Sequence, residues 1–386
     1  MKAPVFALAA AALLAGLPAA GAALAADTIK IGSLLPMTGG SAGLGVAVRD
    51  GQKLAVARIN ATGWVLGRKL ELVELDDEAR PELGPGHMRT LLARGIVACV
   101  CGVNTGVVAS YQSLLQVARI PNLIPASAGT RLTRNFSAAP GGNYSFRVQA
   151  SDALQAQMMV DHAAKKGYTR IAILYDSTPY GSGGRDDMVK QLMTHGLRPV
   201  AASSFNLNET DMRVHLLKAR EAGAQALLVY GIGPEQGRIA AANAAMNIRL
   251  PLIGSWPNAT DAFVAAAGAG ADGALSPQTF VDGSASQGGR EFEAAYHAMY
   301  KRSRIVTPTA AAGGHDAVLL LAAAIRQAGS TDGALIKAAL EHLAAPVQGA
   351  ITTYIQPYSA DDHEAIDQGN AMMAMWKNGM IVRAPQ

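Results

Sequence analysis

The chain has 386 residues, of which 50% are hydrophobic, 16% charged and 5% aromatic. A chain of this length and composition can bury a large core and is long enough for two domains. Its 33 basic and 29 acidic residues give a formal charge of +4, with no block of more than two consecutive Lys or Arg residues. This balance argues against a nucleic-acid partner and against a polybasic membrane anchor.

The first 26 residues predict a secretory signal peptide. Lys2 is the only charged residue, the stretch 6–17 is almost wholly apolar, and Ala23-Leu24-Ala25 has the small-x-small pattern of a cleavage site. A membrane anchor needs about 20 unbroken apolar residues, and glycine and proline interrupt this stretch earlier. We therefore expect an exported chain, cut near Ala25 and periplasmic if the source is a Gram-negative bacterium.

From Asp27 to about residue 147, short apolar runs alternate with amphipathic stretches. The runs are predicted as strands at 28–35, 69–75, 96–101 and 122–124. The stretches at 44–55 and 85–94 are predicted as helices. Such alternation is typical of a parallel sheet covered by helices on both faces.

The same alternation restarts after Phe146-Arg147-Val148 and indicates a second parallel unit. Its predicted helices are 151–166, 183–195, 211–222 and 234–246, and its predicted strands are 170–175, 200–205, 226–230 and 250–253. The chain continues with a strand at 273–279, helices at 289–302, 314–328 and 333–343, and strands at 351–355 and from 371 onward. The last two strands bracket an acidic turn at 361–364.

The two cysteines, Cys99 and Cys101, are two positions apart in a predicted strand and point from the same face of it. In an extended strand their Cα atoms lie roughly 6.5 to 7 Å apart with parallel Cβ vectors, at or beyond the edge of disulfide reach. We therefore interpret them as two buried free thiols, in preference to a disulfide or a metal pair.

Sequence signatures of nucleotide binding and of catalysis are missing. The glycine-rich connection 39–45, which includes Leu44, has no G-x-G-x-x-G frame and no Gly-Lys-Ser/Thr, so we expect it to line another kind of cleft. The eight histidines form no His-Glu-x-x-His motif, and no Gly-x-Ser-x-Gly elbow precedes a helix. The acidic turns 76–78 and 361–364 are interpreted as solvated turns rather than cation sites. No catalytic residue, metal or cofactor is predicted.

Two polar loops follow predicted strands at the edge where open parallel sheets bind ligands. They are Gly102-Val103-Asn104-Thr105-Gly106 and Pro125-Ala126-Ser127-Ala128-Gly129-Thr130. Each offers hydroxyl side chains and free backbone N–H groups, which suit a carboxylate. Ordinary helix capping by Thr105 and Thr130 is an equally weighted alternative.

Four segments, taken in order, resemble the leucine/isoleucine/valine-binding-protein family of ABC importers. They are Thr28–Gly39, Gly63–Asp77, Arg170–Gly181 and Tyr230–Glu235. The resemblance runs from about Asp27 to the C-terminus and is specific for the family, not for the ligand.

The resemblance implies an α/β type I periplasmic binding protein, with two doubly wound parallel-sheet lobes that are joined by three crossings and close on a small ligand. The implied lobes are 27–147 with 277–349, and 148–276 with 350–386. The three crossings that form the hinge are expected near Arg147, Ser276 and Gly349.

The resemblance also implies the ligand-binding residues. The ligand carboxylate is expected at Asn104, Thr105, Ser127, Ala128, Gly129 and Thr130. The closing lobe is expected to contribute Tyr180, Tyr230, Gly231 and Ile232.

In family members that bind α-amino acids, an acidic residue after the strand matching 250–253 receives the ligand ammonium, and this chain has Trp256 there. A buried ammonium without a counter-charge is costly, whereas an indole is a flat apolar wall. We therefore expect a carboxylate without an α-ammonium group, of the aromatic type. Glu235 or Asp261 as a displaced acidic partner, and Trp256 packed under the lobe surface, are the alternatives.

The resemblance and the predicted leader together favour an extracytoplasmic solute-binding protein that delivers a small carboxylate, amino acid-like or aromatic, to a membrane ABC permease. We expect a monomer without enzymatic activity. A sensor that signals to a histidine kinase or another regulator is the alternative from another class. An exported hydrolase ranks third, because the sequence lacks a nucleophile–base signal.

Overall fold

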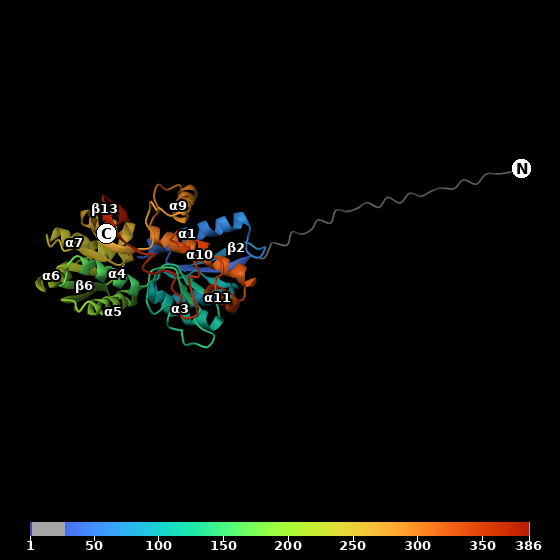
Figure 1. Ribbon diagram of the computed structural model, residues 1–386, viewed down its shortest axis with the longest axis horizontal. Helices are drawn as coiled ribbons and strands as arrows, with labels where there is room; N and C mark the ends of the chain where they lie inside the picture. The colour runs from blue at the N-terminus through green and yellow to red at the C-terminus, as the bar shows by residue number, and fades with distance from the viewer. Residues whose placement is uncertain (2–27, 386) are drawn as a thin grey trace.

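The computed structural model describes Met1 and residues 28–385, which form two lobes lying side by side (Figure 1). Residues 2–26 of the predicted signal peptide, with its cleavage site, lie outside the described residues. Each lobe has its own sheet with helices on both faces. The predicted α/β architecture of two parallel-sheet lobes is confirmed.

The first lobe contains a fully parallel five-stranded sheet of order β2-β1-β3-β4-β5. Its strands are β1 (Ile29–Leu35), β2 (Leu70–Asp76), β3 (Ala98–Cys99), β4 (Asn122–Ile124) and β5 (Ser145–Arg147). One face packs on α1 (Ala42–Thr62), α10 (Pro308–Ala328) and α11 (Gly333–Glu341), and the other on α2 (Gly84–Ala93) and α3 (Thr105–Ala118). Helix α9 (Gln287–Tyr300) packs beside α1 (Figure 1).

Helices α1 and α10 approach each other at two glycines. A Cβ atom on Gly51 would lie 1.9 Å from the carbonyl oxygen of Ala311, and one on Gly314 would lie 2.2 Å from that of Val48. Only glycine allows backbones to come this close. Although α10 is long and apolar enough to cross a membrane, 89% of its apolar window is buried, as expected for the core helix of a globular lobe.

The second lobe contains a seven-stranded sheet of order β14-β13-β10-β9-β8-β6-β7. Its strands are β6 (Ile171–Asp176), β7 (Ala201–Phe205), β8 (Ala226–Tyr230), β9 (Leu252–Gly254), β10 (Leu275–Gln278), β13 (Met372–Lys377) and β14 (Met380–Arg383). Strands β6 to β10 are parallel, whereas β13 and β14 are antiparallel additions. Helices α4 (Asp152–Lys165) and α5 (Pro179–Thr194) cover one face, and α6 (Arg213–Glu221), α7 (Gly233–Ala245) and α8 (Asp261–Ala267) the other.

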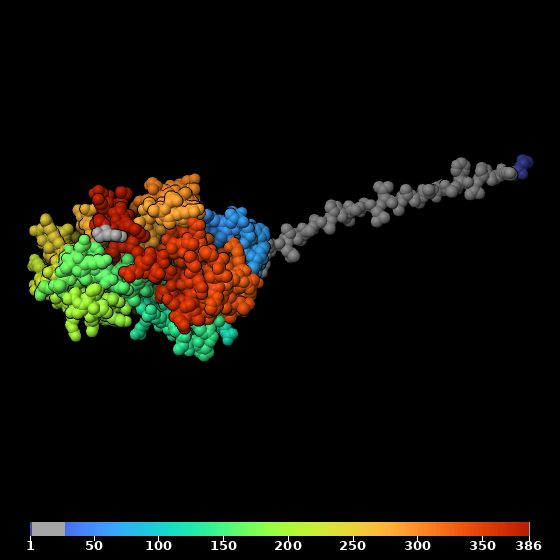
Figure 2. All heavy atoms as spheres, viewed as in Figure 1, coloured from blue at the N-terminus to red at the C-terminus, as the bar shows by residue number. Residues whose placement is uncertain are grey.

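The third crossing between the lobes lies later in the chain than the expected position near Gly349. The hairpin of β11 (Val347–Gln348) and β12 (Thr353–Tyr354) and the following residues to Ile366 pack into the core of the first lobe. The chain reaches the sheet of the second lobe only at β13. In Figure 2 the red C-terminal region accordingly covers parts of both lobes. Buried Tyr354 and Tyr358 explain the difference, because both rings belong to the first core.

The acidic turn at 361–364 is only partly the solvated turn that we expected: Asp361 and Asp362 are exposed, whereas His363 and Glu364 pack against the first lobe. His363 is buried and stacks on Phe146 with ring centroids 3.9 Å apart. Glu364 pairs with Arg147 of β5. The turn therefore closes the edge of the first sheet.

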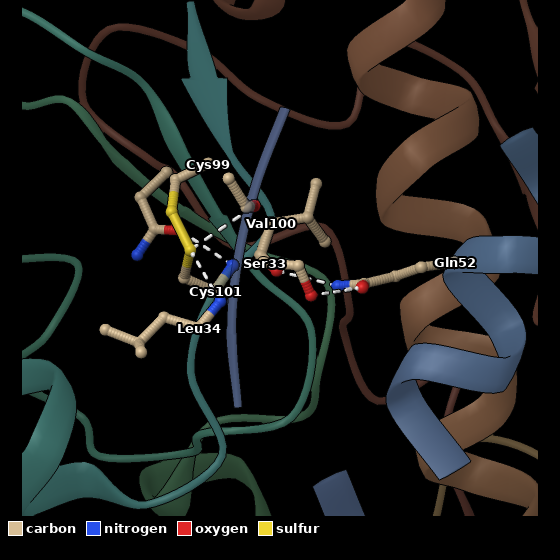
Figure 3. The surroundings of a disulfide bond; sticks show 8 residues. Ser33, Leu34, Gln52, Cys99, Val100 and Cys101 are labelled. Atoms are coloured by element: carbon tan, nitrogen blue, oxygen red, sulfur yellow. Dashed lines mark hydrogen bonds between the residues drawn. A yellow bond between two sulfur atoms is a disulfide. The ribbon is translucent and has the colours of Figure 1, made fainter. Parts of the chain in front are cut away.

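The interpretation of Cys99 and Cys101 as free thiols is wrong, since the two residues form a disulfide (Figure 3). Both side chains do point to the same face of the sheet, as predicted, and that face is the one covered by α2 and α3. The extended-strand estimate failed because regular strand ends at Cys99, and the N–H of Cys101 bonds to the side-chain oxygen of Asn122. The Cα atoms are only 5.4 Å apart, within disulfide reach.

Candidate ligand-binding cleft

A cleft of about 340 Å³ lies between the two lobes. Its walls are the loops and helix starts that follow β1, β2 and β3 in the first lobe and β6, β7, β8 and β9 in the second. This is the carboxyl edge of both parallel sheets, where backbone N–H groups at helix starts are free to bind a ligand.

Half of the predicted site residues line this cleft, and half lie behind its walls. Those lining it are Leu44, Asn104, Thr105, Tyr180, Ile232 and Trp256. Those not lining it are Ser127, Ala128, Gly129, Thr130, Tyr230 and Gly231. Further lining residues include Ser41 and Val103, which lie in the two loops already expected at a cleft, and Glu78, Thr178, Leu207 and Asn208, which the prediction lacked. Most follow strands, so the edge-of-sheet rule applied to β2 and β7 would have found several of them.

The start of α3 forms the polar part of the wall in the first lobe. Asn104 is the N-cap residue, but neither its side chain nor that of Thr105 caps the helix. The Thr105 hydroxyl instead lies 3.2 Å from the hydroxyl of Ser127, so the capping alternative is wrong for Thr105. Asn104 donates its amide to the Ser41 hydroxyl at 3.0 Å. The first-turn N–H groups of α3 carry the positive end of the helix dipole, which favours an anion.

Two further long helices, α1 and α7, also begin at the cleft without a side-chain cap. Among the described residues that line the cleft, none is Lys, Arg or His. Its two carboxylates, Glu78 and Glu235, each lie near an arginine that is not part of the lining, at 3.4 Å from Arg80 and 3.0 Å from Arg238. An anion in this cleft would therefore be held by backbone N–H groups and hydroxyls rather than by a cationic side chain.

Trp256 forms an apolar part of the wall in the second lobe. It starts the short 3-10 turn Trp256–Ala259 directly after β9 and is 3% exposed. Its backbone N–H donates to the side-chain oxygen of Gln155 at 3.0 Å, and its backbone carbonyl accepts from the side-chain amide of Gln278 at 2.8 Å. It shares one apolar cluster with Leu44 and Tyr180. The alternative that Trp256 packs away from the ligand under the lobe surface is therefore disfavoured.

Tyr180 is in the first turn of α5, and Thr178 caps that helix. Its ring lies 4.8 Å from that of Tyr230, which stands behind the wall. Burial raises the pKa of Tyr180 well above its usual value, so its phenol is neutral. Tyr230 donates to a carboxylate oxygen of Asp152 at 2.6 Å. Burial raises the pKa of Asp152 to about 7.

Thr130 connects the two lobes rather than lining the cleft. Its hydroxyl donates to Asp187 of α5 at 2.7 Å and accepts the N–H of Ala153 in the first turn of α4 at 2.9 Å. Both partners belong to the second lobe. The hydroxyl is thus occupied, and it satisfies a helix start in the other lobe.

The acidic turn at 76–78 supports the cleft and is only partly solvated, since Glu78 is exposed whereas Asp77 is not. Asp76 accepts the N–H groups of Met37 and Glu78 at 2.8 and 2.9 Å, and Asp77 is fully buried. Glu78 and Ala79 line the cleft with φ angles of 52° and 59°. Within residues 28–385, no three His, Cys, Asp or Glu side chains gather as a metal-binding group.

Comparison with known proteins places the chain in one family. Residues 28–379 match the family model described as periplasmic binding protein. The chain is 26% identical over 355 residues to Leu/Ile/Val-binding protein homolog 3 of Brucella melitensis, covering 92% of this chain and 93% of the relative. A type 1 periplasmic binding protein from Bordetella pertussis has a TM-score of 0.84 at 25% identity, with 93% of this chain and 100% of that chain covered.

A solute-binding protein of an ABC transporter from Rhodopseudomonas palustris, solved with benzoate, has a TM-score of 0.80 at 21% identity and supports the fold alone. It covers 92% of this chain and 95% of its own. This chain therefore belongs to the periplasmic binding protein family, in the type I group that includes the leucine/isoleucine/valine-binding proteins. The family is extracytoplasmic, and the Rhodopseudomonas palustris protein is a solute-binding protein of an ABC transporter.

Proposed function

We propose that the chain captures a small aromatic carboxylate without an α-ammonium group between its lobes and delivers it to a membrane ABC permease. The observation that carries the ligand class is the position of Trp256, buried in the wall of the cleft that Leu44 and Tyr180 also line. An indole stacks on an aromatic ring and adds roughly 0.5–1.5 kcal/mol beyond area burial. It offers no counter-charge to an ammonium group.

The proposed carboxylate position is the start of α3, at the Thr105 hydroxyl and the free N–H groups that follow it. Hydrogen bonds to a charged group are worth roughly 1.5–3 kcal/mol each. Tyr180 closes over the other end of the ligand from the second lobe. Ser127, Ala128, Gly129 and Thr130 then act from behind this position, with Ser127 supporting the Thr105 hydroxyl.

The descriptions of similar proteins include both amino acids and an aromatic acid as ligands. The Brucella relative is named for leucine, isoleucine and valine, whereas the Rhodopseudomonas structure holds benzoate. The acids Glu235 and Asp261 are the alternative ammonium acceptors in this chain, and each already pairs with an arginine, Arg238 and Arg304 respectively. These pairs favour the aromatic acid.

The proposal also includes a periplasmic location, a monomeric state and the absence of turnover. A signalling receptor remains the second candidate on the sequence argument alone. Neighbouring permease and ATPase genes support transport, whereas a neighbouring kinase gene supports sensing.

Calorimetric titration and tryptophan fluorescence with benzoate and with leucine test the ligand class. We expect the wild type to bind benzoate-type acids and to bind leucine poorly. Trp256→Glu should bind the benzoate-type acids about tenfold or more weakly than the wild type. Trp256→Phe keeps an aromatic ring, so its affinity for these acids should fall by less. Trp64→Phe is the control, because Trp64 lies outside the cleft lining beside Lys69. Tight binding of leucine by the wild type would contradict the proposal of an aromatic acid as the ligand.

A further inference from the structure

Glu235 is a buried carboxylate in the cleft wall with one oxygen uncommitted. It lies in the first turn of α7, is 3% exposed and lines the cleft. Oε1 accepts the backbone N–H of Asn208 at 2.9 Å and the Nη1 of Arg238 at 3.0 Å. Oε2 has no hydrogen-bond partner in the described part of the chain, and this oxygen is not completely buried. A hydrogen-bond acceptor is therefore available to the ligand.

We propose that Glu235 selects ligands that carry a hydroxyl group on the aromatic ring, and that its Oε2 accepts the hydrogen bond from this hydroxyl. This inference rests on the proposed function, since it assumes an aromatic carboxylate whose acidic end lies at α3 in the other lobe. The ligand then spans the cleft, with its anion at the first lobe and its donor at the second.

Charge decides which kind of donor fits. The Glu235–Arg238 pair is neutral as a whole, so a neutral hydroxyl adds a charge-assisted hydrogen bond without adding charge to a buried site. An ammonium group would add a positive charge to this pair, with the buried carboxyl of Asp176 as the further acidic group that acts on Glu235. A second carboxylate would be repelled by Glu235 and could not donate. A hydroxyl satisfies these conditions, and a site that bonds to a ligand hydroxyl discriminates against the analogue that lacks it.

The test compares benzoate, 3- and 4-hydroxybenzoate, 4-methoxybenzoate and leucine by calorimetric titration of the full chain. We expect at least one hydroxybenzoate to bind the wild type about tenfold or more tightly than benzoate, and 4-methoxybenzoate to bind no better than benzoate. Glu235→Gln keeps an oxygen for Asn208 and Arg238 but can place an amide donor where Oε2 was. It should shrink the hydroxyl preference at least fivefold and improve methoxybenzoate relative to hydroxybenzoate.

Glu221→Gln is the matched control, because Glu221 is exposed at the end of α6, in the same lobe and outside the cleft lining. Its ligand preferences should equal those of the wild type. Equal binding of benzoate and both hydroxybenzoates, or a hydroxyl preference unchanged in Glu235→Gln, overturns the role of Glu235 while leaving the aromatic-acid function intact. Tight leucine binding without binding of any aromatic acid overturns the proposed function itself. Thermal melting of each variant verifies that it is folded.

Discussion

Arg147 and Glu364 form a bidentate ion pair, with Nε to Oε2 and Nη2 to Oε1 both at 2.8 Å, although 217 residues separate them. Arg147 is fully buried. Its Nη1 donates to the backbone carbonyls of Ser127 and Gly129 at 3.2 and 3.0 Å, and its Nη2 to the Thr133 hydroxyl at 3.1 Å. One guanidinium thus holds the loop behind the cleft, the edge strand β5 and the late C-terminal segment together.

The Arg147–Glu364 pair should contribute strongly to stability. Arg147→Leu leaves a carboxylate and two carbonyls without their partner, so we expect a loss of about 3–5 kcal/mol in the free energy of unfolding. Urea unfolding measures it. The double variant Arg147→Leu/Glu364→Leu should lose clearly less than the sum of the two single variants, because no charge is left unpaired. Additive losses would show that the two side chains do not interact.

Thr105→Ala should weaken ligand binding about tenfold or more, because Thr105 lines the cleft. It should not lower the melting temperature through a lost cap, because its hydroxyl caps no helix. Ser286→Ala provides the opposite pattern. The Ser286 hydroxyl caps α9 by accepting the N–H of Gly289 at 3.0 Å, and its loss should cost about 1 kcal/mol of stability with unchanged affinity. Unchanged affinity in Thr105→Ala would remove this residue from the site.

Stability should fall as the pH rises from about 5 to 8. Burial raises the pKa values of Asp77 and Asp152 to about 7 in the folded protein, from about 3.9 in an unfolded chain. The native state therefore binds more protons in this range, so the stabilisation is fully present below pH 4 and is lost as the pH passes 7.

Asp152→Asn should reduce this pH dependence, and Asp77→Asn/Asp152→Asn should remove most of it. Urea unfolding at pH 5 and pH 8 measures the effect. Asp367→Asn is the control because Asp367 is exposed, and it should retain the wild-type dependence. A double variant as pH-dependent as the wild type would contradict the assignment.

The disulfide predicts that Cys99 and Cys101 do not react with iodoacetamide in denaturant unless the protein is first reduced. Mass spectrometry should find no label on the oxidised protein and two labels after reduction. Two labels without reduction would restore the interpretation as free thiols.

Local patterns predicted much of the fold. The predicted strands 122–124 and 226–230 have the bounds of β4 and β8. Helix α3 was expected only as an unbounded helix or turn after the polar loop 102–106, although Val107, Tyr111 and Leu115 are buried at helical spacing. The predicted strand 96–101 is longer than β3, because the N–H of Cys101 donates to the Asn122 side-chain oxygen instead of continuing the ladder, and a disulfide follows the strand.

The site was harder to predict than the fold, because it depends on how the lobes face each other. Strand ends indicated the loops with Thr105 and Thr130 equally well. Only the placement of α4 and α5 shows that the Thr130 hydroxyl is bonded to the second lobe while Thr105 faces the cleft. The partner of Arg147 lies 217 residues away, which no local periodicity reveals.

The backbone contact of Gly51 and Gly314 has a mechanical consequence for ligand capture. With main chains touching, α1 and α10 cannot slide past each other without collision. The first lobe should therefore move as a rigid body. Opening of the cleft should be confined to rotation of one lobe against the other about the three crossings. Two spin labels within this lobe should keep their separation when ligand binds, while a pair that spans the two lobes should change its separation.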